Sequence, residues 1–355
     1  MKDLKYLLAY LMPISAAFAM YWQGPWSWST VVWAFVVIPL AELVLPVSAA
    51  NAGREEEERR AASPWFDWLL YLNAPILFGI TGWYLYTVSH QTLSPAELAG
   101  LTLCTGLIIG SSGINVAHEL GHRSGRADQT LAKWMLLPAL YQHFFIEHNR
   151  GHHKNVGTDK DPATARFGEP LYAFWLRSVA GNWRNAWALE AERLEKEGRS
   201  RWSWDNEMLR FSAWEVFWLG GIYALFGWKG LAGAIAVAVT GFLLLETINY
   251  IEHYGLRRRL LASGRPEPVS PAHSWNSDHE LGRIFLYELT RHSDHHYKAT
   301  RKYQVLRHLD ESPQLPFGYP ASMVLALAPP VWFAVMNPRV KAVEDRMAAD
   351  LQSAA

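Results

Sequence analysis

The stretch Glu97–His122, ELAGLTLCTGLIIGSSGINVAHELGH, joins a long apolar run directly to two histidines four residues apart. A helix needs about 20 mostly apolar residues to cross a bilayer core, and residues 97–117 meet this requirement. Positions i and i+4 lie on one helix face, so the imidazoles of His118 and His122 can reach one metal ion. This stretch predicts a membrane-spanning helix that carries metal ligands at its end.

Composition limits the classes of protein to which the chain can belong. The 355 residues have no net charge, so no basic signature indicates nucleic acid as a partner. The single cysteine, Cys104, excludes a disulfide framework and a cluster of thiolate ligands. The chain therefore carries no thiolate-bound redox centre of its own.

The apolar runs predict a polytopic membrane protein. Six segments qualify as spans, at about 4–21, 29–48, 65–88, 97–117, 214–228 and 231–250. The fifth is short and has Glu215 near its start. A seventh run, 319–336, is interrupted by two prolines and is expected to pack into the cytosolic body instead.

Lys and Arg set the expected orientation, because they concentrate in cytoplasmic loops. They occur in the N-terminal segment and after the second, fourth and sixth spans, whereas loops 22–28 and 89–96 have none. Both termini are therefore expected in the cytosol. Polar blocks 121–210 and 255–355 would form a helical cap there, giving one all-α unit over residues 1–355.

Nine of the fourteen histidines lie at the cytosolic ends of the predicted spans or in the cap. They are His118, His122, His148, His152, His153, His253, His292, His295 and His296. One zinc ion takes three or four ligands, so nine imidazoles indicate two metal ions, and imidazole alone leaves the metal open among iron, copper, nickel and zinc. Gly151 is expected to end the helix that carries His148 and His152. No metal is assigned to His90, His143, His273, His279 and His308.

Carboxylates accompany these histidines. Metal-bound imidazoles usually donate their second N–H to a carboxylate or carbonyl, and this outer role is predicted for six acids. They are Glu119, Glu147, Asp159, Asp161, Glu252 and Asp294. Salt bridges to neighbouring arginines are the alternative.

Four segments carry a resemblance to a known family. They are HELGHR (118–123), EHNRGHHKNVGTDKDPATAR (147–166), NYIEHYGL (249–256) and LTRHSDHHYKATRKYQ (289–304). They resemble the histidine boxes of membrane alkane 1-monooxygenases and, more distantly, those of xylene monooxygenases, fatty-acid desaturases and sterol or fatty-acid hydroxylases. The likeness extends over nearly the whole chain. Arg123 departs from the expected lysine but keeps its charge.

The resemblance implies that the nine histidines bind two iron ions as a non-haem di-iron site, with O2 as co-substrate. It implies terminal hydroxylation of medium-chain n-alkanes to primary alcohols in a bacterial inner membrane, with the active site in the cytosol. The electrons would come from rubredoxin, which an NAD(P)H-dependent rubredoxin reductase reduces. Basic residues at 257–259 and at 298, 301 and 302 offer a surface for an acidic partner, although positive-inside topology already accounts for the first cluster.

An apolar substrate is expected to enter from membrane lipid between the spans. Residues on the helix faces that lead to His118 and His253 are predicted to line its channel, together with an aromatic residue of the second span. They are Trp33, Leu107, Ser111, Asn115, Glu246 and Asn249. The small residues at 110–113 either leave room for the substrate or let helices pack closely.

Other interpretations of the same residues are left open. A membrane fatty-acyl desaturase or hydroxylase, or a xylene-type monooxygenase, uses similar boxes. A membrane zinc metalloprotease would use His118, Glu119 and His122 as an HExxH motif. A metal transporter would instead place its histidines within the spans.

Overall fold

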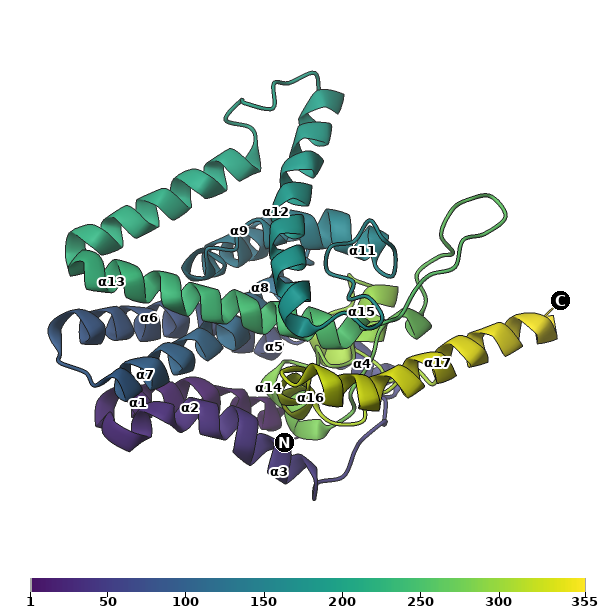
Figure 1. Cartoon of the computed structure of the whole chain (residues 1–355), viewed down its shortest axis with the longest axis horizontal. Helices are drawn as coiled ribbons and strands as arrows, with labels where there is room; N and C mark the ends of the chain where they lie inside the picture. The colour runs from purple at the N-terminus through teal and green to yellow at the C-terminus, as the bar shows by residue number, and fades with distance from the viewer. Residues whose placement is uncertain (1, 355) are drawn as a thin grey trace.

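The computed structural model describes residues 2–354, and helices dominate it (Figure 1). Over this range the extended pairs are isolated bridges such as Val47 with His279, and no strand forms. The predicted all-α fold is confirmed.

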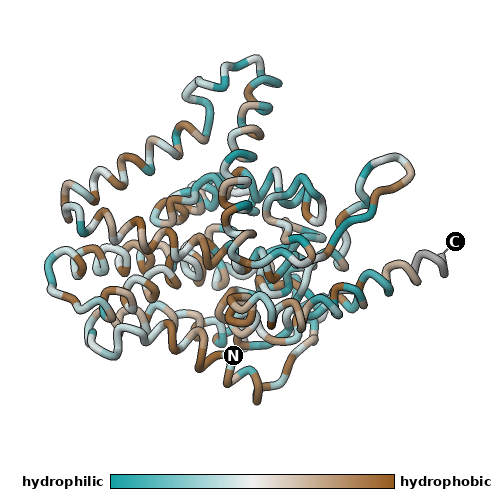
Figure 2. The backbone as a smooth tube through the Cα atoms, in the orientation of Figure 1, coloured by the Kyte–Doolittle hydropathy of each residue, from teal (hydrophilic) through white to brown (hydrophobic). Residues whose placement is uncertain are grey.

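Within residues 2–354, five helical stretches are long and apolar enough to cross a membrane. They are Asp3–Trp22, Gly24–Glu42, Pro64–His90, Pro95–Gly121 and Glu207–His253. Several run side by side on one side of the molecule, where hydrophobic residues are concentrated, while hydrophilic residues gather toward the other side (Figure 2). The chain is therefore an integral membrane protein by helix length and composition.

These stretches are made of shorter labelled elements. The first contains η1 (Lys2–Tyr10) and α1 (Leu11–Trp22). The second contains η2 (Gly24–Trp28), α2 (Ser29–Val32), η3 (Trp33–Val37) and α3 (Ile38–Glu42). The third contains α5 (Pro64–Tyr71) and α6 (Asn73–His90), and the fourth contains α7 (Pro95–Ile108), η4 (Ile109–Ile114) and α8 (Asn115–Gly121). The fifth is α13 (Glu207–His253).

The predicted second span extends too far toward the C-terminus. Its helix ends at Glu42 rather than near residue 48. Glu42 is buried and accepts a hydrogen bond from the Gly282 N–H at 2.9 Å. The helix thus ends at the residue that makes this long-range contact, and the local sequence does not reveal the contact.

The predicted fifth and sixth spans are the two arms of α13. Gly227 interrupts the helix with φ 64° and ψ −164°, a conformation that glycine adopts without strain from a Cβ atom. The first arm, 207–226, is about 30 Å long, which equals the thickness of a bilayer core. The chain turns back at Gly227, and the two arms diverge from this bend (Figure 1).

Small residues bring α7 and η4 against the second arm of α13. A Cβ atom at Gly106 would lie 2.3 Å from Thr240, and one at Gly110 would lie 2.5 Å from a methyl carbon of Leu244. At Gly110, the close-packing alternative for the small residues therefore applies.

The remaining helices surround the ends of these stretches. They are α4 (Arg54–Ala62), α9 (Arg126–Met135), η5 (Leu137–Ala139), α10 (Phe144–Glu147), η6 (His148–His152), α11 (His153–Asn155), α12 (Leu171–Lys196), η7 (Pro271–His273), α14 (Glu280–Phe285), α15 (His292–Tyr297), η8 (Tyr303–Val305), α16 (Tyr319–Ala326) and α17 (Pro329–Ala354). Helix α12 runs across the long helices rather than along them (Figure 1).

The proline-interrupted run at 319–336 packs into the body, as expected. It divides into α16 and the start of α17, and neither helix has the length and hydropathy of a span. Tyr319, Met323 and Trp332 are buried in one core cluster with Tyr250 and Tyr254 of the α13 end. The run therefore supports the segment that carries His253.

Candidate metal centre

The nine predicted histidines come together in two groups. The five-histidine group contains His118, His122, His148, His153 and His295, and the four-histidine group contains His152, His253, His292 and His296. Within each group, one ring nitrogen from every residue lies within 4.8 Å of the others. Segments up to about 180 residues apart in sequence thus meet at one place.

Each histidine is positioned by a helix end or a short helix. His118 lies in α8 and His122 caps it, while His253 ends α13. The third predicted cluster forms α15, and the second spans η6 and α11. Apart from α8 and α13, which end long helical stretches, these histidine-bearing elements are short, so packing rather than helix propensity must fix the positions of their imidazoles.

The helix carrying the second cluster does not end at Gly151. It continues as the π-helical turn η6 and then as α11. A Cβ atom on Gly151 would lie 2.5 Å from Oε1 of Glu147 and 2.7 Å from Nδ2 of Asn185. Glycine is therefore present because two neighbouring side chains occupy the space next to it, and π-turns of this kind occur often at functional sites.

The distances between Nε2 atoms fit shared metal ions. In the five-histidine group, His148 lies 3.1 Å from His122 and 3.0 Å from His153. In the four-histidine group, His296 lies 2.9 Å from His292 and 3.2 Å from His152. Ligand nitrogens about 2.1 Å from a metal are about 3.0 Å apart in an octahedron and about 3.4 Å apart in a tetrahedron. The nitrogens are thus spaced as neighbouring ligands are.

Electrostatics keep most of these imidazoles in the form that binds metal. Burial, and to a smaller extent repulsion from neighbouring histidines, lowers the pKa of six predicted ligands outside the candidate membrane spans well below the usual range. This holds for His122, His148, His153, His292, His295 and His296. A neutral imidazole has a lone pair for the metal, whereas a protonated one has none.

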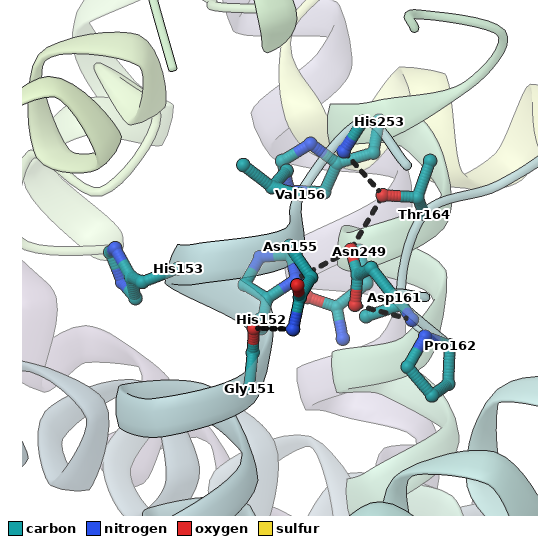
Figure 3. A network of polar contacts seen from close by, with 12 residues as sticks. Gly151, His152, His153, Asn155, Val156, Asp161, Pro162, Thr164, Asn249 and His253 are labelled. Atoms are coloured by element: carbon teal, nitrogen blue, oxygen red, sulfur yellow. Dashed lines mark hydrogen bonds and ion pairs between the residues drawn. The ribbon is translucent and has the colours of Figure 1, made fainter. Parts of the chain in front are cut away.

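His152 is the exception because it has a carboxylate partner. Burial acts to lower its pKa, but Asp161 outweighs burial and raises it. Nδ1 of His152 lies 2.9 Å from Oδ2 of Asp161, which also accepts a hydrogen bond from Thr164 Oγ1 at 2.5 Å. Figure 3 shows Asp161 between these two residues, with His153 pointing away from it. Asp161 therefore has the geometry of an outer carboxylate that orients a ligand.

The other predicted outer acids have different partners. Glu119 lies 3.4 Å from Arg123, and Asp294 lies 3.3 Å from Arg301, as in the salt-bridge alternative. Asp159 pairs with Arg257, and its side chain is 81% exposed.

Glu147 and Glu252 are buried beside the histidines. Glu147 accepts a hydrogen bond from Asn185 at 2.9 Å, and its burial raises its pKa to about 8. The carboxylate of Glu252 lies 3.2 Å from Nε2 of His292, not from its Nδ1. It therefore contacts the ring nitrogen that faces the centre of the four-histidine group.

A small, mostly apolar cavity touches both histidine groups. Its lining comprises Gly110, Ser111, Asn115, His118, Phe144, His148, Leu244, Leu245, Ile248, Asn249, Glu252, Leu286, Leu289 and His292. Three predicted channel residues, Ser111, Asn115 and Asn249, are among them.

Two further cavities adjoin this one, one after the other in space. The next, lined by residues that include Phe35, Leu107 and Tyr319, shares Ser111 and Leu244 with the first. The outer one has a volume of about 450 Å³ and shares Phe35, Leu107 and Leu244 with the second. Leu244 lines all three, and the outer cavity is bordered by partly exposed apolar residues.

Two predicted channel residues lie elsewhere. Trp33 lines a separate hollow between the first two long helices and packs against Phe285 at a ring distance of 6.3 Å. Glu246 accepts hydrogen bonds from Tyr141 at 2.7 Å and Asn182 at 3.1 Å, and also from Ser178. Glu246 thus belongs to a buried polar network that joins α12 to α13.

Sequence reasoning missed several apolar residues of the inner cavity. Leu245 lies four and eight residues before Asn249 and His253, so helical periodicity would have placed it on the same face. Phe144, Leu286 and Leu289 come from short segments around α10 and α14. No periodic signal marks these three, because their position depends on how the segments fold back.

Long apolar helices with two histidine groups at their ends define an integral-membrane metalloprotein of the histidine-box class. Residues 93–324 match the model of the fatty acid desaturase family. Over 323 residues the chain is 40% identical to alkane 1-monooxygenase 2 of Pseudomonas aeruginosa, covering 90% of this chain and 86% of that protein. It is 39% identical to the alkane 1-monooxygenase of Acinetobacter baylyi, covering 86% of this chain and 74% of the relative.

A more distant relative is the hydroxylase component of the xylene/toluene monooxygenase of Pseudomonas putida. It is 27% identical, and the match covers 98% of this chain and 92% of that protein. Taken together, these matches mean that the chain belongs to the fatty acid desaturase family and, within it, to the alkane 1-monooxygenases.

Proposed function

We propose that this protein is a membrane alkane 1-monooxygenase that uses O2 to convert medium-chain n-alkanes to primary alcohols. The observation that carries the proposal is the apolar cavity in contact with both histidine groups. The identity of 36–40% to alkane 1-monooxygenases over most of the chain supports it.

The five- and four-histidine groups would each hold one iron ion. Bound iron would supply the activation of O2 and the cleavage of the terminal C–H bond. The protein holds the imidazoles neutral through burial and spaces their nitrogens as neighbouring ligands. Asp161 fixes the ring of His152 through Nδ1, so that Nε2 faces the metal.

The apolar side chains of the cavities would position the substrate and exclude water. The two outer cavities have no charged side chain among the described residues that line them. Such a surface matches an alkane, which has no polar group to bind. A fatty-acyl substrate would need partners for its polar head group along this route, which argues against the desaturase and acyl-hydroxylase alternatives.

The reaction also needs two electrons, because one oxygen atom of O2 enters the alcohol and the other leaves as water. The only cysteine, Cys104, is buried and donates to the Ser27 carbonyl oxygen at 3.1 Å. An external donor is therefore required. We propose rubredoxin, itself reduced by an NAD(P)H-dependent rubredoxin reductase.

We place the protein in a bacterial inner membrane with six spans, counting the arms of α13 separately. Both termini and the metal centre would then face the cytosol. Lys and Arg in the loops on that side support this orientation.

The protease interpretation of His118, Glu119 and His122 fits the geometry less well. Both histidines belong to a group of five rather than to a three-ligand zinc site. Glu119 pairs with Arg123, which also lies 2.7 Å from Asp67. A carboxylate held in this way is not free to activate water.

Turnover of octane by the purified protein in lipid nanodiscs would test the function. The assay contains iron, ¹⁸O2, rubredoxin, its reductase and NADH. The expected product is 1-octanol labelled with ¹⁸O, and a reaction without rubredoxin is the control. Octene as the product would favour a desaturase, and a lack of any oxygenated product from the iron-loaded protein would contradict the proposal.

A further inference from the structure

We propose that Glu252 supplies a carboxylate oxygen to the metal ion of the four-histidine group, an inference that rests on the proposed di-iron function. Glu252 precedes His253 at the end of α13 and is 1% exposed. It lines the inner cavity, and among the described residues of that lining it is the only acidic one.

The carboxylate is held in place from both sides. Oε1 of Glu252 accepts a hydrogen bond from the Tyr319 hydroxyl at 2.8 Å. Oε2 lies 3.2 Å from Nε2 of His292, whose own neighbour His253 is also 3.2 Å away through Nε2. The oxygen thus stands at the same distance from His292 as a neighbouring imidazole ligand does.

Charge explains why a cation belongs beside this pair. The lone pair of a neutral imidazole and a carboxylate oxygen repel one another in a buried environment unless a proton or metal lies near both. A metal ion shared by the two atoms removes the repulsion.

Glu252 also differs from most other acids around the histidines. Arg123 compensates Glu119, and Arg301 compensates Asp294. Among the described residues, the only basic partner of Glu252 within ion-pair distance is His292. Neutral imidazole ligands do not compensate the positive charge of a metal ion, and burying such charge is costly. Glu252 places a negative charge where it offsets this cost.

The Glu252 carboxylate would give the two metal ions the same number of donor atoms. The first group offers five imidazoles and the second only four. One oxygen from Glu252 gives the second metal a fifth donor. A mixed set of imidazole and carboxylate donors is also suited to iron.

The substitution Glu252→Gln tests this role because an uncharged amide replaces the carboxylate. The readouts are iron per purified chain and the ⁵⁷Fe Mössbauer spectrum, neither of which needs an alkane. Iron content is expected to fall from about two toward one per chain, with one spectral component lost. Release of the remaining weakly held iron to a chelator is expected to be at least ~10-fold faster than in the wild type.

Glu246→Gln is the matched control. Glu246 is a buried carboxylate on the same helix, but its partners are Tyr141, Ser178, Asn182 and Asn249, and no histidine lies within ion-pair distance of it among the described residues. Its substitution is expected to leave iron content and spectrum unchanged. Two irons with an unaltered spectrum in Glu252→Gln would overturn the assignment.

Glu252→Asp covers the case in which the glutamine variant does not fold. It keeps the charge but withdraws the oxygen by one methylene group, so the spectrum of one iron should change. An unchanged spectrum and release rate would overturn the assignment. A wild-type protein that binds two irons but makes no alcohol would instead contradict the proposed function and leave the role of Glu252 intact.

Discussion

His152 and His153 are adjacent in the chain but face different histidine groups. Nε2 of His152 lies 3.2 Å from His296, whereas Nε2 of His153 lies 3.0 Å from His148. Consecutive residues on a helix differ in direction by about 100°, and the π-helical turn of η6 leads directly into this pair. The turn thus distributes one sequence motif between the two histidine groups.

Gly151→Ala should disturb this distribution. The added Cβ would lie 2.5 Å from Glu147 Oε1 and 2.7 Å from Asn185 Nδ2, so η6 or α12 must shift. We expect a loss of stability of about 1–3 kcal/mol and less than two irons per chain. Thermal unfolding and iron analysis measure both effects.

Gly168→Ala is a control for the general effect of adding a methyl group to a glycine. No atom lies within 4 Å of its added Cβ, although its φ of 74° adds backbone strain. This variant should lose some stability but keep its iron. If Gly151→Ala also keeps two irons, the close contact at Gly151 does not position the histidines.

Asp161→Asn should weaken the four-histidine site. The carboxylate accepts from His152 Nδ1 at 2.9 Å and thereby fixes the tautomer of the ring. Loss of an outer carboxylate of this kind typically costs about 10- to 100-fold in metal affinity. Competition with a chelator at fixed pH measures the change.

Asp159→Asn provides the comparison for Asp161, since it lies two residues earlier and its side chain is 81% exposed. Its iron affinity should equal that of the wild type within about twofold, as expected for a surface position. Equal weakening in both variants would show that the loop as a whole, rather than the bond to His152, supports the site.

Eight of the nine histidines could be grouped from sequence because their motifs are local, whereas His253 has no histidine three or four residues away. Spacings of three and four residues place histidines on a common helix face without knowledge of the fold. The division into groups of five and four could not be predicted, since it depends on the π-helical turn at His148–His152 and on how α15 meets α13. From sequence alone, Asp161 could either orient a histidine ligand or form a salt bridge with an arginine. Its distance of 2.9 Å to His152 Nδ1 favours the first alternative.

The long helices were predicted for a similar reason, because apolar length is also a local property. A turn just after residue 228 was expected between the fifth and sixth spans, but the exact position of the bend, Gly227, and the early end at Glu42 were not predicted. The first depends on a positive φ that a glycine permits but does not require, and the second accompanies a contact with Gly282 about 240 residues away. Glu246 was assigned to the channel for its place on α13, but α12 supplies two of its partners, Ser178 and Asn182.

Acid should destabilise the iron-free protein as pH falls below about 6.5, the ordinary pKa of histidine. Burial lowers the pKa of the non-ligand His143 to about 3. The unfolded chain therefore binds a proton at this residue between about pH 6.5 and 3, while the folded chain does not. Up to about 1.4 kcal/mol of stability is lost per pH unit from such a group.

His143→Phe tests this titration without touching a ligand. Its ring would replace an imidazole that packs 4.2 Å from the ring of Tyr141. The slope of unfolding free energy against pH should decrease in the iron-free variant between about pH 6 and 4. An unchanged slope would mean that His143 is not held neutral in the folded protein.

Leu244→Phe should restrict the route between the outer cavity and the metal centre. Leu244 lines all three cavities, so a larger side chain there narrows their junction. We expect turnover of dodecane to fall by at least about tenfold relative to hexane, which corresponds to about 1.4 kcal/mol, because only the longer chain must extend past the junction. Iron content should not change.

Leu243→Phe alters a neighbouring residue that lines the outer cavity only, and it should reduce dodecane turnover less. Equal losses for both alkanes in Leu244→Phe would indicate a general disturbance of the site, and unchanged selectivity would exclude this junction as the path of the substrate.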